Sequence, residues 1–238
     1  WMFLDQTPPG LPRVTLPEVW FLYRTNPSIS FWDTAKLEER MARFPFVVAF
    51  AFTRDETNHF ADILLPDAVD LESLQLIRIG GSKFIEQFWD HEGFALRQPA
   101  IAPRGEARDF TDIATALAEH TGLLERYNAA INRGAIGVPL KDFALDTGRA
   151  HSVEEIWDAA CKAASFELSG GAEVNGLAWW KEHGLATRPF PRTAWYLFPT
   201  LAARGLRFEM PYQERLLRVG TELGRRLHEH GMTWWDKQ

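Results

Sequence analysis

The sequence has 238 residues, of which 46% are hydrophobic and 24% are charged, so it is long and apolar enough to form one large or two small globular cores. The formal net charge is -6 and no basic block occurs, which excludes an extended nucleic-acid-binding surface. Cys161 is the only cysteine, so these residues form no internal disulfide or cysteine-bound cluster, and we expect Cys161 to be a small buried hydrophobe.

The predicted elements begin with strands that alternate with helices. A continuous apolar run at residues 19–23 is typical of a strand covered on both faces. A polar turn at residues 25–28 follows it. Asp33 is then placed to cap a helix that ends near Phe44. Residues 46–52 predict a second buried strand.

A polar exit at residues 53–57 follows the second strand, and residues 58–61 fit a short helix before a third strand at residues 62–66. Strands that alternate with helices imply a parallel sheet with right-handed crossovers. Ligands of such sheets bind beyond the carboxyl ends of the strands. We therefore expect a Rossmann-like α/β fold whose two polar exits form the ligand site.

The pattern changes after the third strand. Residues 67–103 read as a long connection without regular structure, and residues 111–120 as a helix. Ser152 begins a capping-box helix that runs to about Leu168. Pro211 opens a last helix that Gly231 ends, so we expect a Rossmann-like region over residues 1–125 and a mainly helical segment over residues 126–238.

Several familiar catalytic patterns are absent: there is no nucleophile elbow, P-loop, HExxH motif or nicotinamide fingerprint. His59 is either a proton shuttle or, more simply, a structural histidine. The triplets at residues 90–92 and 228–230 look metal-like, but adjacent side chains point in different directions, so we expect no metal site. The carboxylates near residues 67–72 form an acid/base pair or, more simply, cap a turn.

Three segments, in this order, resemble the molybdopterin oxidoreductases of the dimethyl sulfoxide reductase family. Residues 23–30 end a strand and continue into Asn26-Pro27. Residues 55–66 contain Glu-Thr, Ala-Asp and Leu-Pro at that family's spacing. Residues 97–108 contain Gln-Pro and then Pro-x-Gly-Glu-Ala.

The resemblance implies a bis(molybdopterin guanine dinucleotide) cofactor with molybdenum or tungsten. It also implies a 4Fe-4S cluster in a region upstream of these residues, and a barrel beyond their carboxyl end. The aromatic-rich ends and the ten tryptophans lead us to expect a piece of a longer protein, whose surfaces pack against other parts. This piece alone would be inactive.

Carried over residue by residue, the resemblance assigns cofactor binding to two groups of positions. The first turn contributes Thr25, Asn26, Pro27 and Ser28, and the second contributes Thr53, Asp55, Glu56 and Thr57. Asp109 is a further expected contact, although it lies one place earlier than the family's acid. Ala51 stands where many members have a guanine-binding Asp, and Asp55 is the candidate substitute.

Residues 86–99 and 208–215 are most similar to the branch with phenylacetyl-CoA:acceptor oxidoreductase and the thiosulfate and polysulfide reductases. The resemblance implies a small-molecule or CoA-thioester substrate, an iron–sulfur electron-transfer subunit and a membrane anchor subunit. It implies a cytoplasmic or peripheral membrane location, with a periplasmic one open. The alternative from a different functional class is a non-catalytic α/β nucleotide-binding module, because a fold does not fix a function.

Overall fold

The computed structural model describes residues 17–30, 33–79, 91–189 and 209–231. The chain divides into two compact units. One comprises Trp1–Ile77 and Phe94–Ala186, and the other comprises Arg78–Gly93 and Thr187–Gln238. The functional boundary expected near residue 125 stays a prediction.

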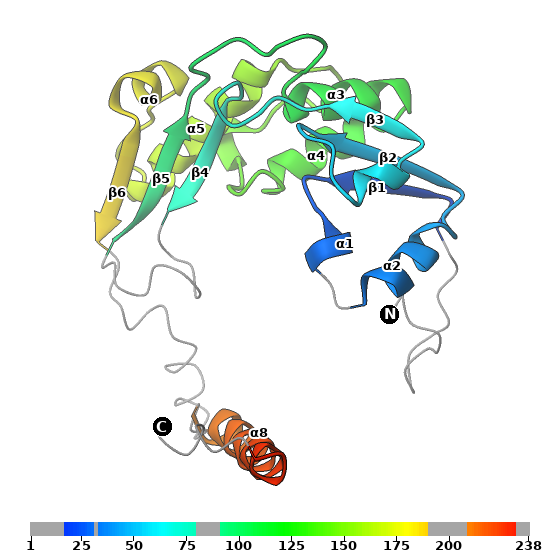
Figure 1. The fold of residues 1–238 in the computed structure, drawn as a ribbon. Helices are drawn as coiled ribbons and strands as arrows, with labels where there is room; N and C mark the ends of the chain where they lie inside the picture. Colours follow the sequence, from blue (N-terminus) through cyan, green and yellow to red (C-terminus); the bar gives the residue numbers. More distant parts are fainter. Residues whose placement is uncertain (1–16, 31–32, 80–90, 190–208, 232–238) are drawn as a thin grey trace. The chain divides into compact units, whose positions relative to one another are not determined.

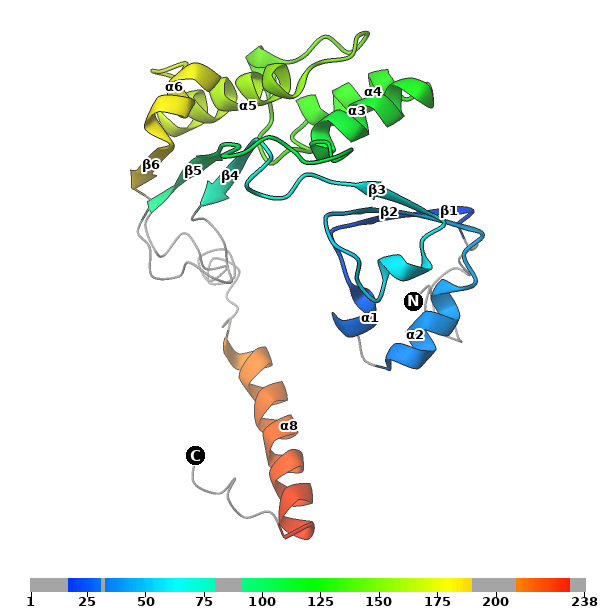
Figure 2. The same cartoon turned by 45° about the horizontal axis from the view of Figure 1, so that its top comes forward.

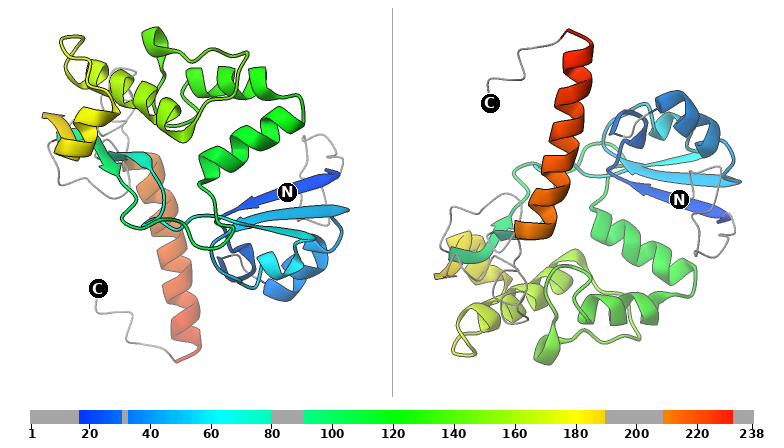
Figure 3. Two further views of the ribbon diagram at one scale, coloured as in Figure 1. Left: turned by 90° about the horizontal axis from the view of Figure 1, so that it is seen from above. Right: turned by 90° about the horizontal axis from the view of Figure 1, so that it is seen from below.

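A parallel sheet of three strands forms the first half of the first unit. Its strands are β1 (Val19–Tyr23), β2 (Phe46–Ala51) and β3 (Ile63–Pro66), in the order β1-β2-β3. Phe21 pairs with Val48 and Phe50 pairs with Leu65, and both ladders are parallel. The strands lie side by side in Figure 3. This confirms the α/β class, and the apolar runs marked all three strands correctly.

Helices cover both faces of this sheet (Figures 1 and 2). α1 (Pro27–Ser30) and α2 (Thr34–Met41) lie on one face, where Leu37 and Met41 pack with Leu22 and Val47. α3 (Phe110–His120) lies on the other. There its Ile113 packs with buried β2 side chains, those of Val48 and Phe50. Asp33 caps α2 as expected, because its carboxylate accepts a hydrogen bond from the N–H of Lys36 at 3.3 Å.

The segment expected to be a structureless connection contains two strands, so that expectation was wrong. β4 (Gln75–Ile79) and β5 (His91–Arg97) join β6 (Leu185–Pro189) in a second sheet of order β4-β5-β6. Charged residues inside these strands hide the apolar pattern. Glu92 is buried and forms ion pairs with Arg78 on β4 and Arg188 on β6.

The chain beyond α3 is mainly helical, as expected. Its helices, including the short 3-10 segment η2, are α4 (Leu124–Asn132), η2 (Lys141–Phe143), α5 (Val153–Leu168), α6 (Leu177–His183) and α8 (Glu209–Glu229). The predicted capping box opens α5: Ser152 and Glu155 each accept the other's backbone N–H. α8 begins at Glu209, two residues before Pro211. Proline is tolerated in the first turn of a helix, so Pro211 is compatible with this start.

A second core contains more buried side chains from α5 than from any other element, together with side chains of β4, β5 and α6. Cys161 is fully buried there, and burial raises the pKa of its thiol to about 12, which confirms its role as an inert hydrophobe. Trp157 and Trp180 are buried in this core. The tryptophans that the structure describes are buried or half-buried, so they form no exposed aromatic surface. None of the described helices is both long and apolar enough to span a membrane.

Candidate functional site

The two predicted polar exits lie at the same edge of the first sheet. Because β1 and β2 are parallel neighbours, their carboxyl ends meet there. The first exit begins at Arg24, whose N–H donates to the carbonyl of Phe50 at 3.2 Å. The second exit follows Ala51 and turns through η1 (Asn58–Phe60). The strand order therefore places the two segments next to each other.

The hydroxyl of Thr57 joins the two exits. Thr57 is fully buried, and its Oγ1 accepts the N–H of Ser28 at 2.9 Å and donates to Oδ1 of Asn26 at 2.6 Å. Asn26 in turn donates through Nδ2 to Glu56 at 2.7 Å. Four of the residues expected from the sequence thus form one hydrogen-bonded group, which we call the Asn26–Thr57 network.

The remaining expected residues lie around this network. Oδ1 of Asp55 accepts the N–H groups of Thr57 and Asn58, at 2.9 and 2.7 Å, so this oxygen shapes the turn. Pro27 is buried at the start of α1. The side chains of Thr25 and Thr53 are exposed. The structure therefore separates residues that build the turns from residues that remain accessible beside them.

Glu56 is the accessible carboxylate of the network. The hydrogen bond from Asn26 lowers its pKa below the ordinary value, because that bond stabilises the charged form. Glu56 is exposed, so a ligand can reach it. At neutral pH this position presents a negative hydrogen-bond acceptor, which suits the hydroxyl and N–H donors of ribose or guanine.

A second charged group surrounds Arg24, which the sequence reasoning missed. Arg24 has the left-handed φ of 44°. Its guanidinium donates to Asp67, to Asp70 at 2.9 Å and to the carbonyl of Ala68 at 2.6 Å. Arg97 shares Asp70 at 2.7 Å. The carboxylates weighed as an acid/base pair are thus arginine partners, while Glu72 caps the turn by accepting the N–H of Val69.

Asp67 lies in a strongly desolvated position. It is 2% exposed, and its Oδ1 has no hydrogen-bond partner within the described part of the chain. Burial raises the pKa of Asp67 above its ordinary value, although Arg24 acts in the opposite direction. Desolvation alone would lower the pKa of Arg24, but the hydrogen bond and charge of Asp67 outweigh it and the pKa is raised.

Asp109 does not join the Asn26–Thr57 network. It caps α3 by accepting the N–H of Thr111 at 2.8 Å, and its other oxygen accepts the N–H of Leu74 at 3.1 Å. Ala51, the position of the missing acid, ends β2, where its carbonyl accepts the N–H of Asp67. Asp62 belongs to the Ala-Asp pair of the motif at residues 55–66. It accepts the N–H of Val47 at 2.7 Å and so has a structural role.

Among the described residues, no group of three His, Cys, Asp or Glu side chains is placed to hold a metal ion. Asp90 lies outside the described residues. His59 is exposed on η1 and packs edge-to-face against Phe60. The residues that the structure brings together at the two exits are joined by hydrogen bonds.

Comparison with known proteins finds similarity in the same region. Residues 9–120 match the family model "Molybdopterin oxidoreductase". A stretch of 107 residues, 44% of this chain, is 29% identical to "Probable oxidoreductase YoaE" from Bacillus subtilis (strain 168) and covers 14% of that protein. Both strand exits lie inside the range that matches the family model. This chain is thus similar to molybdopterin oxidoreductases over its first half.

A solved structure, "Acetylene Hydratase from Pelobacter acetylenicus", is similar at 21% identity and a TM-score of 0.36. The match covers 48% of this chain and 15% of the hydratase. The chain therefore spans about a seventh of each of these two proteins.

Proposed function

We propose that this chain contributes a dinucleotide-binding half-site to the catalytic subunit of a molybdenum or tungsten oxidoreductase. The observation that carries the proposal is the Asn26–Thr57 network, which joins two strand exits within the region similar to that family. Ligands of parallel α/β sheets bind at this edge. In the proposed site Thr25, Thr53 and Glu56 contact the cofactor, while Asn26, Ser28, Asp55 and Thr57 hold the two turns.

The groups present fit the nucleotide part of a molybdopterin guanine dinucleotide. The exposed hydroxyls of Thr25 and Thr53 can donate to phosphate or accept from ribose, and the ionised Glu56 can accept from guanine or ribose. Among the described residues no cluster of three His, Cys, Asp or Glu side chains is placed to hold a metal ion, and the proposal assigns them no metal ligand. When bound, the cofactor supplies electron and oxygen-atom transfer.

The proposed whole enzyme also contains a 4Fe-4S cluster and works with an iron–sulfur subunit and a membrane anchor subunit. Its proposed reaction is the oxidation of phenylacetyl-CoA at the activated methylene to the keto level. Water supplies the oxygen atom in this reaction, and the electrons and protons pass to quinone. Thiosulfate or polysulfide reduction is the alternative, and both rest on the resemblance of residues 86–99 and 208–215.

Cofactor analysis of the complete protein tests the family proposal. We expect anoxically purified protein to contain molybdenum or tungsten by mass spectrometry, and to release GMP after acid hydrolysis of the pterin dinucleotide. Folded complete protein that contains neither metal nor pterin would instead support the non-catalytic α/β nucleotide-binding module.

Substrate assays then separate the two reactions. Cofactor-loaded protein is incubated with phenylacetyl-CoA and a quinone analogue, and separately with thiosulfate or polysulfide and a reduced dye. We expect turnover with the thioester. Turnover with only the sulfur compounds would replace the first assignment by the second, and turnover with neither would remove both while leaving the cofactor result intact.

A further inference from the structure

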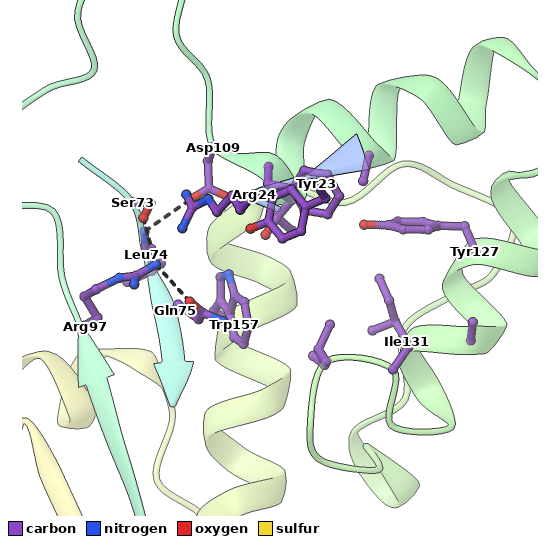
Figure 4. A pocket seen from close by; sticks show the side chains of 16 residues that line it. Tyr23, Arg24, Ser73, Leu74, Gln75, Arg97, Asp109, Tyr127, Ile131 and Trp157 are labelled. Atoms are coloured by element: carbon purple, nitrogen blue, oxygen red, sulfur yellow. Dashed lines mark hydrogen bonds between the residues drawn. The ribbon is translucent and has the colours of Figure 1, made fainter. Parts of the chain in front are cut away.

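A cavity of about 380 Å³ lies within the first unit, beside the amino-terminal end of α3 (Figure 4). Side chains from β1, α3, α4 and α5 line it, together with residues at the start of β4. Its volume is within the range of small-molecule sites. No member of the Asn26–Thr57 network lines it, and Asp109 is the one residue that it shares with the cofactor contacts expected from the sequence.

Aromatic and aliphatic side chains form most of the cavity wall. Tyr23 stacks on Phe110 with ring centroids 3.9 Å apart on one side. Tyr127 and Ile131 face the interior from α4, and Trp157 closes it from α5 (Figure 4). Such a wall offers ring faces and edges to a flat apolar molecule.

The hydrogen-bonding groups at this wall include unpartnered donors. Nε1 of Trp157 is buried without a partner among the described residues, and Trp157 is 4% exposed. Figure 4 shows this ring nitrogen directed toward the side where Tyr23 and Arg24 lie. Nε of Arg97 is likewise buried without a described partner. A buried N–H that lacks an acceptor costs free energy, so an occupant that brings an acceptor is favoured.

The acceptors at the wall are already engaged. Both oxygens of Asp109 receive backbone N–H groups. Ser73 Oγ and Gln75 Oε1 accept hydrogen bonds from the guanidinium of Arg97, at 2.9 and 2.8 Å. Burial raises the pKa values of Tyr23 and Tyr127, so both phenols keep their protons and can also donate. The cavity therefore complements a molecule with acceptors better than one with donors.

The charges around the cavity leave no positive excess. Arg24 and Arg97 line it, but Asp67 and Asp70 pair with these guanidinium groups. Asp109 adds a further carboxylate. An anion would meet this carboxylate without a free cation to balance it, whereas a neutral molecule avoids that repulsion.

We propose that this cavity binds a small neutral aromatic molecule that carries a carbonyl-type hydrogen-bond acceptor, which the indole N–H of Trp157 recognises. The site is distinct from the proposed dinucleotide contacts of the two strand exits. Its occupancy does not depend on the metal or on turnover.

Matched probes test the proposal on the complete protein. Acetophenone carries the carbonyl, isopropylbenzene has nearly the same shape without an acceptor, and benzoate has the ring with a negative charge. Saturation-transfer NMR titrations give the three affinities. We expect acetophenone to bind about fivefold more tightly than isopropylbenzene, as one hydrogen bond provides, and more tightly than benzoate. No binding of acetophenone, equal affinities for the ketone and hydrocarbon, or a preference for benzoate would overturn the proposal.

Two variants locate the site. Trp157→Phe removes the indole N–H, so the preference for ketone over hydrocarbon should disappear. Ala114→Leu fills space at the wall and should weaken both probes. Trp179→Phe is the matched control, because Trp179 stacks on His183 and does not line the cavity. A ketone preference that survives in folded Trp157→Phe, or binding unchanged in Ala114→Leu, contradicts the assignment. These outcomes are independent of the metal and GMP content.

Discussion

At the scale of single residues, Thr57 has the most consequential contacts of the two strand exits. Its hydroxyl both accepts and donates a hydrogen bond in a fully buried position. Valine has nearly the same shape but can do neither. A substitution there leaves the N–H of Ser28 and the amide oxygen of Asn26 without their partner.

Thr57→Val should therefore lower the free energy of unfolding by about 2 kcal/mol, as expected when buried polar groups lose their partner. Urea denaturation measures the change. Thr121→Val is the control, because its hydroxyl donates to the carbonyl of Leu117 at an exposed position and its loss should cost less than about 0.5 kcal/mol. Equal losses in the two variants would show that the Thr57 bonds are not important for stability.

Asp67 gives a prediction about pH. Its pKa is raised in the folded state by burial, so the folded protein favours the protonated acid more than the unfolded chain does. Its contribution to stability is thus present below the ordinary value of 3.8 and is lost as pH rises through the higher folded-state pKa. Wild type should lose stability relative to Asp67→Asn over that interval, measured by urea denaturation at a series of pH values.

Glu56→Gln is a control for which the change of stability with pH should have the opposite sign. The pKa of Glu56 is lowered by Asn26, so its stabilising contribution is present above the ordinary value of 4.5 and is lost as pH falls through the lower folded-state pKa. Wild type should gain stability relative to Glu56→Gln as pH rises through that window. A pH-independent difference for Asp67→Asn would contradict the desolvation account.

The residues of the Asn26–Thr57 network could be named from the sequence because they follow two readable strands. The charged group around Arg24 could not. Arg24 and Asp67 are 43 residues apart, and Asp67 looks like any polar residue after a strand. Only the parallel pairing of the sheet brings the arginine to the buried carboxylate.

At the scale of elements, a helix or strand could be predicted when the residues that stabilise it are close to it in the sequence. β1 and β2 are continuous apolar runs, and α5 carries a local capping box, so all three could be predicted from neighbouring residues. β5 could not, because Glu92 lies in its interior. That charge is balanced by Arg78, 14 residues away, and by Arg188, 96 residues away.

The capping box of α5 gives a prediction at this scale. Ser152→Ala removes the oxygen that accepts the N–H of Glu155 at 3.2 Å, and should lower the free energy of unfolding by about 1 kcal/mol. Ser152→Asp restores an acceptor and should retain most of the stability, as measured by chemical denaturation. If the alanine and aspartate variants were equally destabilised, the cap would not be the cause.

At the scale of the whole molecule, the family resemblance read from three short motifs agrees with the family match over residues 9–120. In the motif at residues 55–66, Asp55 and Asp62 hold the backbone at the second strand exit by accepting backbone N–H groups. Substrate choice rests instead on the resemblance of residues 86–99 and 208–215, part of which lies outside the described residues. It depends on groups that surround the reacting atoms, and the sequence offers no catalytic residue for the proposed reaction.

In the proposed function, the accessible groups at the two exits hold the cofactor while the buried groups hold the turns. The most direct test is the GMP released per folded complete protein in the Thr25→Ala/Thr53→Ala double variant, with Thr121→Ala as the control. We predict that the double variant loses most of its guanine nucleotide, while the control retains it, and that all three proteins have the same unfolding midpoint when compared free of cofactor. Full guanine nucleotide content in the double variant would contradict the claim.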